Sequence, residues 1–391
     1  MSRSKLFKPI QVGNMFLNHR IVHAPMTRLR ATDDGFVTEL MTKYYTQRSC
    51  IPGSLLISDA TFAGEKSGGY PNNPRCFTKE HAKAWIPVTN AIHRNKSYMF
   101  MQFWPLPGEI KDEYRNDIQR LKEIAYNDCP MDPVGLPAGV ESFDTVQGIN
   151  IYKKKYMSKQ DIQEHIRDFV NAASLAIHVA KADGVELHQV NGFLLDRFVL
   201  GGFGNQCDPN YRGSVENRCR FALEVMEAVV QEIGQDKVGY RISPYSAWME
   251  QIDSVETHIY LMKEISRRFP KLAYVHAIEP RQYWNGHMML KSELNTSYLQ
   301  NYWKGPFITA GGYDPGSAKE AADERGTLVA FGRQFIANPD LVYRIQYNLP
   351  LNPYNRSLFY APKNPLGYID YPFSQEYLYA TKGKNNKHTQ V

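Results

Sequence analysis

The stretch SKQDIQEHIRDFVNAASLAIHVAKADGVELH, Ser158 to His188, decides the fold because it joins a clear helix to a short apolar strand. Ser158 and Asp161 form a capping-box pattern where the helix is expected to begin. Apolar residues then recur at steps of three and four, at Ile162, Ile166, Phe169, Val170, Ala173 and Ile177. We expect Gly184 to stop this helix and Gly184–His188 to form the strand that follows. The stretch therefore predicts a helix–strand unit.

Similar units recur along the chain. Seven further runs are rich in strand-forming residues: Arg20–Ala24, Ser54–Ser58, Ser97–Phe103, Lys237–Ser243, Leu272–His276, Phe307–Ala310 and Thr327–Phe331. Segments with helical period lie between most of these runs, and Glu216 to Ile233 is the next clearest. Strands that alternate with helices in this number predict an α/β protein of the (β/α)₈ TIM-barrel class. A doubly wound sheet is the competing architecture.

Two segments do not fit the repeating unit. Phe7 to Phe16, with a turn at Gly13-Asn14, predicts an N-terminal hairpin that plugs one end of the barrel. Residues 105–157 contain Pro and Gly without a clean period and are too long for a plain connection. We interpret them as an inserted lid over the C-terminal mouth. Residues 1–375 would then form one barrel, and residues 376–391 a polar, basic tail, whose last ten residues, KGKNNKHTQV, are expected to be disordered.

Bulk composition narrows the function classes. The 391 residues are 43% hydrophobic and carry a mild net charge of +6. Basic and acidic residues are interspersed, so no face suited to nucleic acid is expected. There is no signal-peptide core and no run of membrane-spanning length. Five scattered cysteines without a C-x-x-C pair indicate neither a disulfide framework nor a metal site. A soluble, cytoplasmic protein without a membrane partner is the expectation.

Candidate functional residues lie at the ends of the predicted strands, where barrel enzymes carry their binding groups. They are Pro25, Met26, Thr27, Asp59, Ala60, Gln102, Trp104, His188, Asn191, Arg241, Gly311, Gly312, Gly332 and Arg333. We expect the barrel to bring them to one mouth.

The last two strands suggest a phosphate site. Loops after the seventh and eighth strands of a barrel commonly bind phosphate through backbone N–H groups and a helix start. Gly311-Gly312 allows close approach of the backbone, Asp314-Pro315 suits a helix start, and Gly332-Arg333 adds a planar cation. Alternatively, the glycines only turn the chain and Arg333 forms an ordinary surface ion pair.

Arg241 is expected inside the barrel, because it lies within a buried strand pattern. An unpaired buried charge is very costly, so Arg241 needs an anionic partner. One possibility is an ion pair with Asp59 or Glu186. The other is a bound cofactor that becomes anionic.

His188 and Asn191 are three residues apart, so they would face opposite sides of a continuous strand. They can approach one ligand if the chain turns after His188, and Gly192 favours such a turn. Their N–H groups could then converge on one oxygen, as in an oxyanion site. Alternatively, His188 is a core residue with its hydrogen bonds satisfied.

Together these residues resemble the Old Yellow Enzyme family, in its fungal branch. The resemblance runs from about Leu6 to about Pro372. Its motifs include HAPMTRLRA (His23–Ala31), YYTQR (Tyr44–Arg48), MQFW (Met101–Trp104), DGVELHQVNGFLL (Asp183–Leu195), KVGYRISPY (Lys237–Tyr245), WKGPFITAGG (Trp303–Gly312), FGRQFIANPDL (Phe331–Leu341) and LGYIDYP (Leu366–Pro372). Members of this family are FMN-dependent barrel proteins that oxidise NADPH and reduce activated alkenes.

The resemblance implies a role for each candidate residue. Thr27 and Gln102 would hydrogen-bond the flavin ring, and Pro25, Met26 and Ala60 would pack on it. Arg241 would lie near the N1/O2 edge of the flavin. Gly311, Gly312, Gly332 and Arg333 would form the FMN phosphate site. His188 and Asn191 would bind the substrate carbonyl oxygen, with Trp104 and Tyr360 lining the substrate pocket.

One departure concerns catalysis. In this family a tyrosine usually protonates the substrate α-carbon after flavin N5 delivers hydride to the β-carbon. Phe193 occupies that position here. It keeps the ring and removes the proton, so proton delivery is expected to be altered. The stretch NQCDPNYRGS (Asn205–Ser214) also departs from the family pattern, which puts the substrate range in doubt.

The leading hypothesis is an FMN-dependent NADPH oxidoreductase acting on enones, quinones or nitro compounds, as a monomer or homodimer. Water or Tyr360 could supply protons to an enone slowly. An isomerase working by reversible hydride transfer is an alternative, because the resemblance includes fungal relatives with Phe at this position. A flavoprotein that mainly binds phenols or steroids is another. A flavin-free hydrolase using Asp59 and Glu279 as paired carboxylates would leave Arg241 and the phosphate loops unexplained.

Overall fold

The structure is a computed structural model. It describes residues 4–67, 71–105, 140–146, 149–154, 157–201, 208–245, 254–284, 287–290 and 295–385. Most of the predicted lid, including residues 106–139, lies outside this part of the chain. The described portion of that insertion contains β6 (Val140–Val146) and β7 (Ile149–Lys154), which pair as an antiparallel hairpin.

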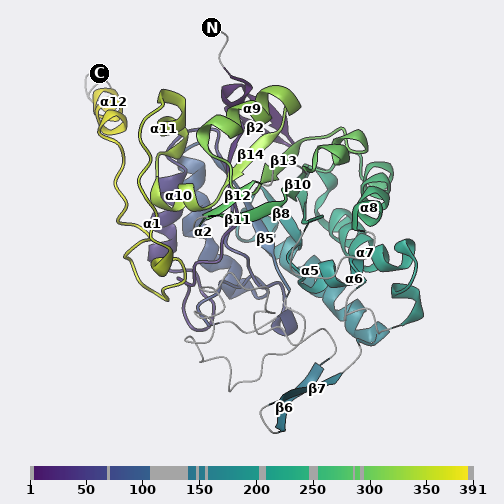
Figure 1. The fold of residues 1–391 in the computed structure, drawn as a ribbon. Helices are drawn as coiled ribbons and strands as arrows, with labels where there is room; N and C mark the ends of the chain where they lie inside the picture. Colours follow the sequence, from purple (N-terminus) through teal and green to yellow (C-terminus); the bar gives the residue numbers. More distant parts are fainter. Residues whose placement is uncertain are drawn as a thin grey trace.

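The eight predicted strands close into a barrel (Figure 1). They are β3 (Ile21–His23), β4 (Leu55–Ile57), β5 (Tyr98–Phe103), β8 (Gly184–Gln189), β9 (Val238–Ile242), β10 (Tyr274–Ile278), β13 (Phe307–Ala310) and β14 (Leu328–Phe331). Neighbours are parallel and follow chain order, and β14 pairs with β3 to close the ring. The barrel prediction is confirmed. The doubly wound alternative is wrong, because an open sheet has two edge strands, whereas each of these eight strands pairs with a neighbour on both sides.

Helices surround the strands in Figure 1. The described helices are α1 (Glu39–Arg48), α2 (Lys79–Arg94), α5 (Lys159–His178), α6 (Leu194–Val199), α7 (Val215–Ile233), α8 (Ser254–Arg268), α9 (Pro315–Arg325), α10 (Arg333–Ala337), α11 (Leu341–Tyr347) and α12 (Gln375–Asn385). Short 3₁₀ turns lie at Lys5–Phe7, Glu65–Ser67, Pro209–Tyr211, Gln235–Lys237, Ser297–Asn301 and Arg356–Leu358, and a hairpin forms from β11 (Arg281–Trp284) and β12 (His287–Leu290). Helix α12 takes in the predicted polar tail as far as Asn385, and residues 386–391 lie outside the described part of the chain.

The helix that opens the deciding stretch begins as predicted but ends early. The reciprocal capping box between Ser158 and Asp161 is present at the start of α5. The helix ends at His178, and Lys181 takes a left-handed conformation with φ 63° before the strand begins. Gly184 therefore does not stop the helix. It opens β8, where an added Cβ would lie 2.2 Å from the Phe100 ring inside the barrel, so close packing requires glycine.

The N-terminal hairpin is confirmed as β1 (Ile10–Val12) and β2 (Met15–Leu17). Val12, Met15 and Leu17 share a buried cluster with apolar residues of the barrel interior. Gly13, at the hairpin turn, has φ 52°, and a Cβ there would lie 2.0 Å from the Asp236 carbonyl oxygen just before β9. The hairpin thus plugs the end of the barrel where the strands begin, and the opposite end remains for the site.

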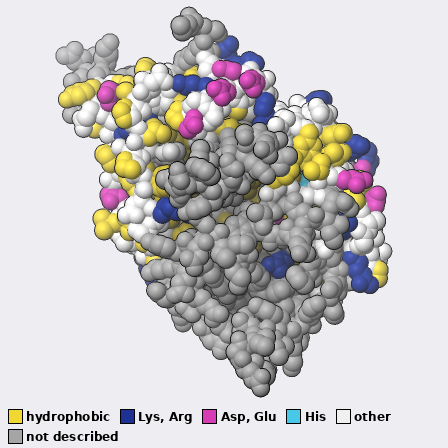
Figure 2. All heavy atoms as spheres, in the orientation of Figure 1, with side chains coloured by type: hydrophobic (Ala, Val, Ile, Leu, Met, Phe, Trp, Pro, Cys, Tyr) yellow, Lys and Arg dark blue, Asp and Glu magenta, His cyan; other side chains and the backbone are white. Residues whose placement is uncertain are grey.

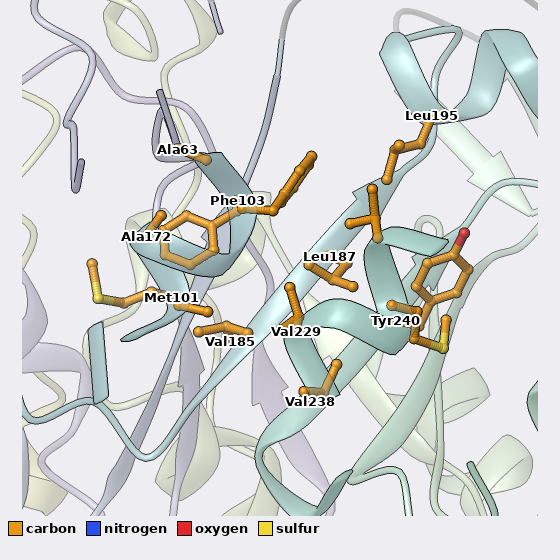
Figure 3. Close-up of a cluster of buried hydrophobic side chains, with 14 of the residues drawn as sticks. Ala63, Met101, Phe103, Ala172, Val185, Leu187, Leu195, Val229, Val238 and Tyr240 are labelled. Carbon is orange, nitrogen blue, oxygen red and sulfur yellow. The ribbon is translucent and has the colours of Figure 1, made fainter. Parts of the chain in front are cut away.

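Alternation along the strands separates two environments. Met101, Phe103, Val185, Leu187 and Tyr240 belong to the buried layer between the strands and helices α5 and α7 (Figure 3). The residues between them face the barrel interior, because successive side chains of a strand point to opposite faces. Gln102, Glu186 and Arg241 occupy those inner positions. On the face shown in Figure 2, basic and acidic side chains are interspersed over the described surface. Among the described helices, none is long and apolar enough to cross a membrane.

Candidate active site

The structure places the predicted strand-end residues at one mouth of the barrel. Residues 25–27 follow β3, Ala60 follows β4, and Trp104 follows β5. Gly311-Gly312 follows β13 and Gly332-Arg333 follows β14. Because all eight strands are parallel and closed, their C-terminal ends meet at the same rim. A Cβ on Gly332 would lie 3.2 Å from Met26 Sδ, so the first and last of these loops touch.

The predicted turn after His188 is present. β8 ends at Gln189, and Asn191 and Gly192 both take left-handed conformations with φ 57° and 74°. Asn191 is half-buried, and Phe193 then precedes α6. The left-handed pair reverses the chain directly after the strand, which is the geometry that His188 and Asn191 need to approach one ligand.

Three rings form one wall of the site. The Phe193 ring meets the Trp104 ring edge-on at 4.8 Å between centroids and the His188 ring at 5.4 Å. Trp104 and His188 are 6.1 Å apart. The structure therefore brings together three candidate residues, one directly after β5, one in β8 and one in the turn after β8.

His188 is electrostatically suited to donate a hydrogen bond rather than carry a charge. Burial, and then the positive charge of Arg241, hold the pKa of His188 well below its ordinary value. Its Nδ1 atom is buried and has no hydrogen-bond partner within the described residues. This open valence favours a ligand-facing role over a core histidine with satisfied hydrogen bonds. A neutral imidazole has one N–H to offer an oxygen in the site.

A buried carboxylate that sequence reasoning missed holds the turn in shape. Asp196 Oδ2 accepts from the Gly192 N–H at 2.8 Å and from the Ser243 hydroxyl at 3.4 Å. The same hydroxyl accepts from the Asn191 N–H at 2.9 Å, while Asp196 Oδ1 accepts from Gln189 Nε2 at 2.7 Å. One acid thus fixes both left-handed residues. The sequence signal was an aspartate in the first turn of a helix, directly after the Asn-Gly turn.

The same carboxylate should make folding stability depend on pH. Burial raises the pKa of Asp196 from 3.8 to about 7, against the lowering effect of its hydrogen bonds. The folded state then holds a proton that the unfolded chain has lost, so stability falls as pH rises from about 4 to about 7. We therefore compare the unfolding free energies of the wild type and Asp196→Asn. The difference, wild type minus variant, should decrease from about pH 4 to about pH 7 and stay constant above pH 7. Urea denaturation at several pH values measures it, and a constant difference would contradict it.

Arg241 has the environment that a cationic flavin contact requires. Burial lowers its pKa, with Glu186 acting in the opposite sense. Its Nε atom is buried and has no hydrogen-bond partner among the described residues. Asp59 is not its partner, because Asp59 accepts from the Tyr45 hydroxyl at 2.5 Å and the Arg28 N–H at 3.0 Å. An unsatisfied guanidinium N–H at the base of the mouth fits a group that becomes anionic, as FMN does on reduction.

The remaining ring contacts are placed as follows. Pro25 is buried, Met26 and Thr27 are half-buried, and Ala60 is 6% exposed. Gln102 is buried in β5, and its amide nitrogen donates to Glu186 at 2.6 Å. These residues lie on adjacent strands at the rim, and their roles toward the flavin stay predictions.

The glycines of the phosphate loops are conformationally required. Gly311 and Gly312 have φ 144° and 105°, a region that other residues rarely adopt. Asp314 caps α9 as predicted, and its carboxylate accepts from the N–H groups of Gly316 and Ser317. Those two donors are therefore taken, and the assignment of the glycine backbone and Arg333 to the FMN phosphate stays a prediction. Arg333 lies 5.5 Å over the Tyr354 ring and donates to its hydroxyl at 3.3 Å.

Replacing Arg333 with alanine should weaken FMN retention. A charge-assisted hydrogen bond to phosphate is worth about 1.5–3 kcal/mol, which corresponds to roughly 10- to 150-fold in affinity. Equilibrium dialysis against free FMN measures the change. Arg344→Ala, which removes a buried arginine paired with Asp340 outside the mouth, is the matched control. Equal FMN affinity in Arg333→Ala and the wild type would contradict the phosphate assignment.

Tyr360 lies in a segment that buried arginines hold in place. It follows the 3₁₀ turn Arg356–Leu358 and is 36% exposed. Arg28 donates to the carbonyl oxygens of residues 359 and 367, and Arg30 donates to those of residues 358, 359, 364 and 366. Sequence reasoning missed this clamp, although both arginines lie in the motif HAPMTRLRA. The structure thus fixes the segment, and the role of Tyr360 in the pocket stays a prediction.

The positions of Asp59 and Glu279 exclude the hydrolase alternative. Asp59 follows β4 and Glu279 follows β10, and these strands lie opposite each other in the barrel order. Glu279 is also engaged, with Arg325 at 2.7 Å and Thr309 at 2.7 Å. Two carboxylates on opposite walls with structural partners cannot act as a catalytic pair. Among the described residues, no group of three or more His, Cys, Asp or Glu could hold a metal.

Comparison with known proteins agrees with this geometry. Residues 5–352 match the model of the NADH:flavin oxidoreductase / NADH oxidase family. A Schizosaccharomyces pombe protein named provisionally as an NADPH dehydrogenase is 72% identical over 376 residues, covering 96% of this chain and 98% of its own. Chanoclavine-I aldehyde reductase of Penicillium roqueforti is 38% identical over 381 residues, covering 96% and 98%.

A solved structure extends the agreement to the fold. The crystal structure of Old Yellow Enzyme from a Pichia species matches with a TM-score of 0.78 and 33% identity, covering 95% of this chain and 94% of its own. The family match, the relatives and the barrel lead to one conclusion. This chain belongs to the NADH:flavin oxidoreductase / NADH oxidase family and is an enzyme of the Old Yellow Enzyme type, with FMN as cofactor and NADPH as reductant.

Proposed function

We propose that this enzyme reduces small electron-poor acceptors, and that quinones and nitro compounds suit it better than enones. The observation that carries the proposal is the packing of Phe193 against Trp104 and His188, at 4.8 and 5.4 Å between ring centroids. Bound FMN supplies the hydride that NADPH provides. The chain's own residues decide where the acceptor lies and whether a proton reaches it.

His188 and Asn191 would bind the acceptor oxygen. Neutral His188 would offer an N–H, and the turn held by Asp196 supports an approach of the Asn191 side chain to the same oxygen. Two donors in a partly dry site stabilise the negative charge that grows on that oxygen during hydride transfer. Acceptors with a carbonyl, quinone or nitro oxygen all meet this requirement.

Phe193 supplies packing but no acid. An enone needs a proton at carbon, and general acid catalysis by a placed side chain is typically worth about 10²–10⁴-fold. Quinones and nitro compounds take protons at oxygen, where exchange with water is fast. The phenylalanine should therefore slow enone reduction and leave the other acceptors unaffected.

The test separates the two half-reactions. The enzyme is first reduced with NADPH under anaerobic conditions, and reoxidation by a quinone, a nitro compound and a simple enone is then followed by flavin absorbance. We expect reoxidation by the quinone and the nitro compound to be faster than by the enone. Failure of NADPH to reduce the flavin would indicate a passive phenol- or steroid-binding protein. An enone as fast as the quinone would contradict the role assigned to Phe193.

Isomerisation is a second candidate, and the same phenylalanine favours it. A hydride delivered to carbon without a following proton can return, and the double bond can rotate in between. Pre-reduced enzyme with an excess of a cis-enone would then yield trans-enone in molar excess over the NADPH consumed. Product that stays equal to NADPH consumed would exclude this activity.

A further inference from the structure

A fully buried carboxylate lies inside the barrel, below the mouth. Glu186 belongs to β8, two residues before His188, and its side chain is 0% exposed. Its Oε1 accepts from Gln102 Nε2 at 2.6 Å, and its Oε2 lies 2.8 Å from His276 Nδ1. The carboxylate thus joins residues of three strands of the barrel, β5, β8 and β10. Barrel interiors are usually filled by branched apolar side chains, so this polar group calls for a function.

Glu186 carries its charge despite this burial. Burial alone would raise the pKa of Glu186, but His276, Arg241 and the hydrogen bond from Gln102 together hold it below its ordinary value. Burial also lowers the pKa of His276, so at neutral pH His276 acts as a neutral hydrogen-bond donor and Arg241 supplies the positive charge. An ionised carboxylate only accepts hydrogen bonds. Both of its oxygens are therefore fixed as acceptors toward Gln102 and His276.

The first consequence concerns the orientation of Gln102. An amide can present either its oxygen or its NH₂ group to a neighbour, and these two orientations differ in what they offer on the other side. Because ionised Glu186 can only accept, the NH₂ group of Gln102 must face it. The Gln102 oxygen is then turned away from Glu186, which makes this residue an acceptor toward a ligand rather than a donor.

The second consequence concerns Arg241. Arg241 lies on β9, where it is paired with His188 of β8 on one side and with His276 of β10 on the other. The negative charge of Glu186 raises the pKa of Arg241, against the effect of burial. Its Nε has no hydrogen-bond partner within the described residues, so its charge is balanced by a nearby carboxylate without being bonded to it. Glu186 therefore reduces the positive potential that Arg241 projects, while the Arg241 N–H remains available.

We propose that Glu186 is a positioning residue for FMN, which orients the Gln102 amide and offsets the charge of Arg241, and so sets the reduction potential of the bound flavin. The inference rests on the proposed placement of the flavin ring against Gln102 and Arg241. Reduced flavin gains negative charge, and an unopposed Arg241 would stabilise it. Glu186 thus keeps the bound flavin a stronger reductant than Arg241 alone would allow.

The test is the two-electron midpoint potential of FMN in Glu186→Gln, measured by spectroelectrochemical titration of the holoenzyme. Glutamine keeps the size and an oxygen for Gln102, and it removes the charge. We expect the potential to rise by about 30 mV or more, which is a tenfold shift of the redox equilibrium for a two-electron couple. Asp340→Asn, which removes a 0%-exposed carboxylate paired with Arg344 outside the barrel, should leave the potential unchanged.

A double variant tests whether the charges of Glu186 and Arg241 oppose each other at the flavin. Removing one partner of a buried charge pair is costly, whereas removing both is tolerated better, so Glu186→Gln with Arg241→Gln also protects against a folding failure. Because the two charges add at the flavin, Glu186→Gln should raise the potential, Arg241→Gln should lower it, and the double variant should lie between the two single variants. An unshifted potential in Glu186→Gln, or a potential that does not fall in Arg241→Gln, would overturn the proposal.

The outcomes also separate this inference from the proposed function. A shifted potential in an enzyme that reduces none of the tested acceptors would contradict the proposed acceptors and support the role of Glu186. Normal quinone reduction with an unshifted potential would support the proposed acceptors and contradict the role of Glu186.

Discussion

Replacing Phe193 with tyrosine should speed reoxidation of the reduced enzyme by a simple enone by about 10²–10⁴-fold. The substitution adds one hydroxyl to a ring that already packs between Trp104 and His188 and so restores an acid with little change in shape. Stopped-flow measurement of the oxidative half-reaction gives the rate directly. Steady-state turnover is a poorer measure, because slow oxidation of NADPH can hide the gain.

Two internal controls accompany this experiment. Flavin reduction by NADPH uses no proton from position 193, so its rate should hardly change. Quinone reduction should also stay level, because its protons go to oxygen. If Phe193→Tyr reoxidises no faster with any enone, either Tyr360 already supplies the proton or the substrate lies elsewhere in the mouth. The explanation based on Phe193 would then be wrong.

Replacing His188 with alanine should lower the affinity for para-substituted phenols by about 10- to 150-fold, because a hydrogen bond to a charged group such as a phenolate is worth about 1.5–3 kcal/mol. In the wild type, a phenolate stacked over FMN should give a long-wavelength charge-transfer band, which titration with the phenol measures. The band should be lost in His188→Ala while FMN stays bound, because the phosphate loops lie on β13 and β14.

His165→Ala is the matched control for this variant. His165 lies in α5, is 8% exposed, and likewise has a buried Nδ1 without a hydrogen-bond partner in the described chain. Its loss removes a comparable buried imidazole away from the three-ring wall, so the band should persist. A band that survives in His188→Ala would show that His188 does not face the ligand.

Much of the fold followed from local pattern. The capping box at Ser158 and Asp161 and the hairpin turn at Gly13-Asn14 are confirmed because both depend on contacts within a few residues. The eight strands are confirmed because short apolar runs between helices have few other ways to be buried. The role of Gly184 was misread because it does not depend on local contacts. This position requires glycine because the Phe100 ring on the neighbouring strand leaves no room for a Cβ.

The candidate site likewise contains features that local sequence predicts and features that it does not. The Asn191-Gly192 turn was predictable because left-handed conformations favour these residue types. The clamp on the Tyr360 segment was not, because Arg28 and Phe359 are 331 residues apart in sequence. No local pattern pairs an arginine with a carbonyl oxygen at that distance.

The sequence by itself determined the barrel, the candidate residues that directly follow its strands, and the missing hydroxyl at Phe193, because these depend on residue identity and short-range periodicity. The tertiary structure alone decided which buried charges meet. Glu186 contacts Gln102 and His276 only because closing the ring brings β5, β8 and β10 together across 84 and 90 residues of sequence. Hydrogen bonds and charge interactions act over a few ångströms in space, so the electrostatics of the site could be established only once the chain had folded.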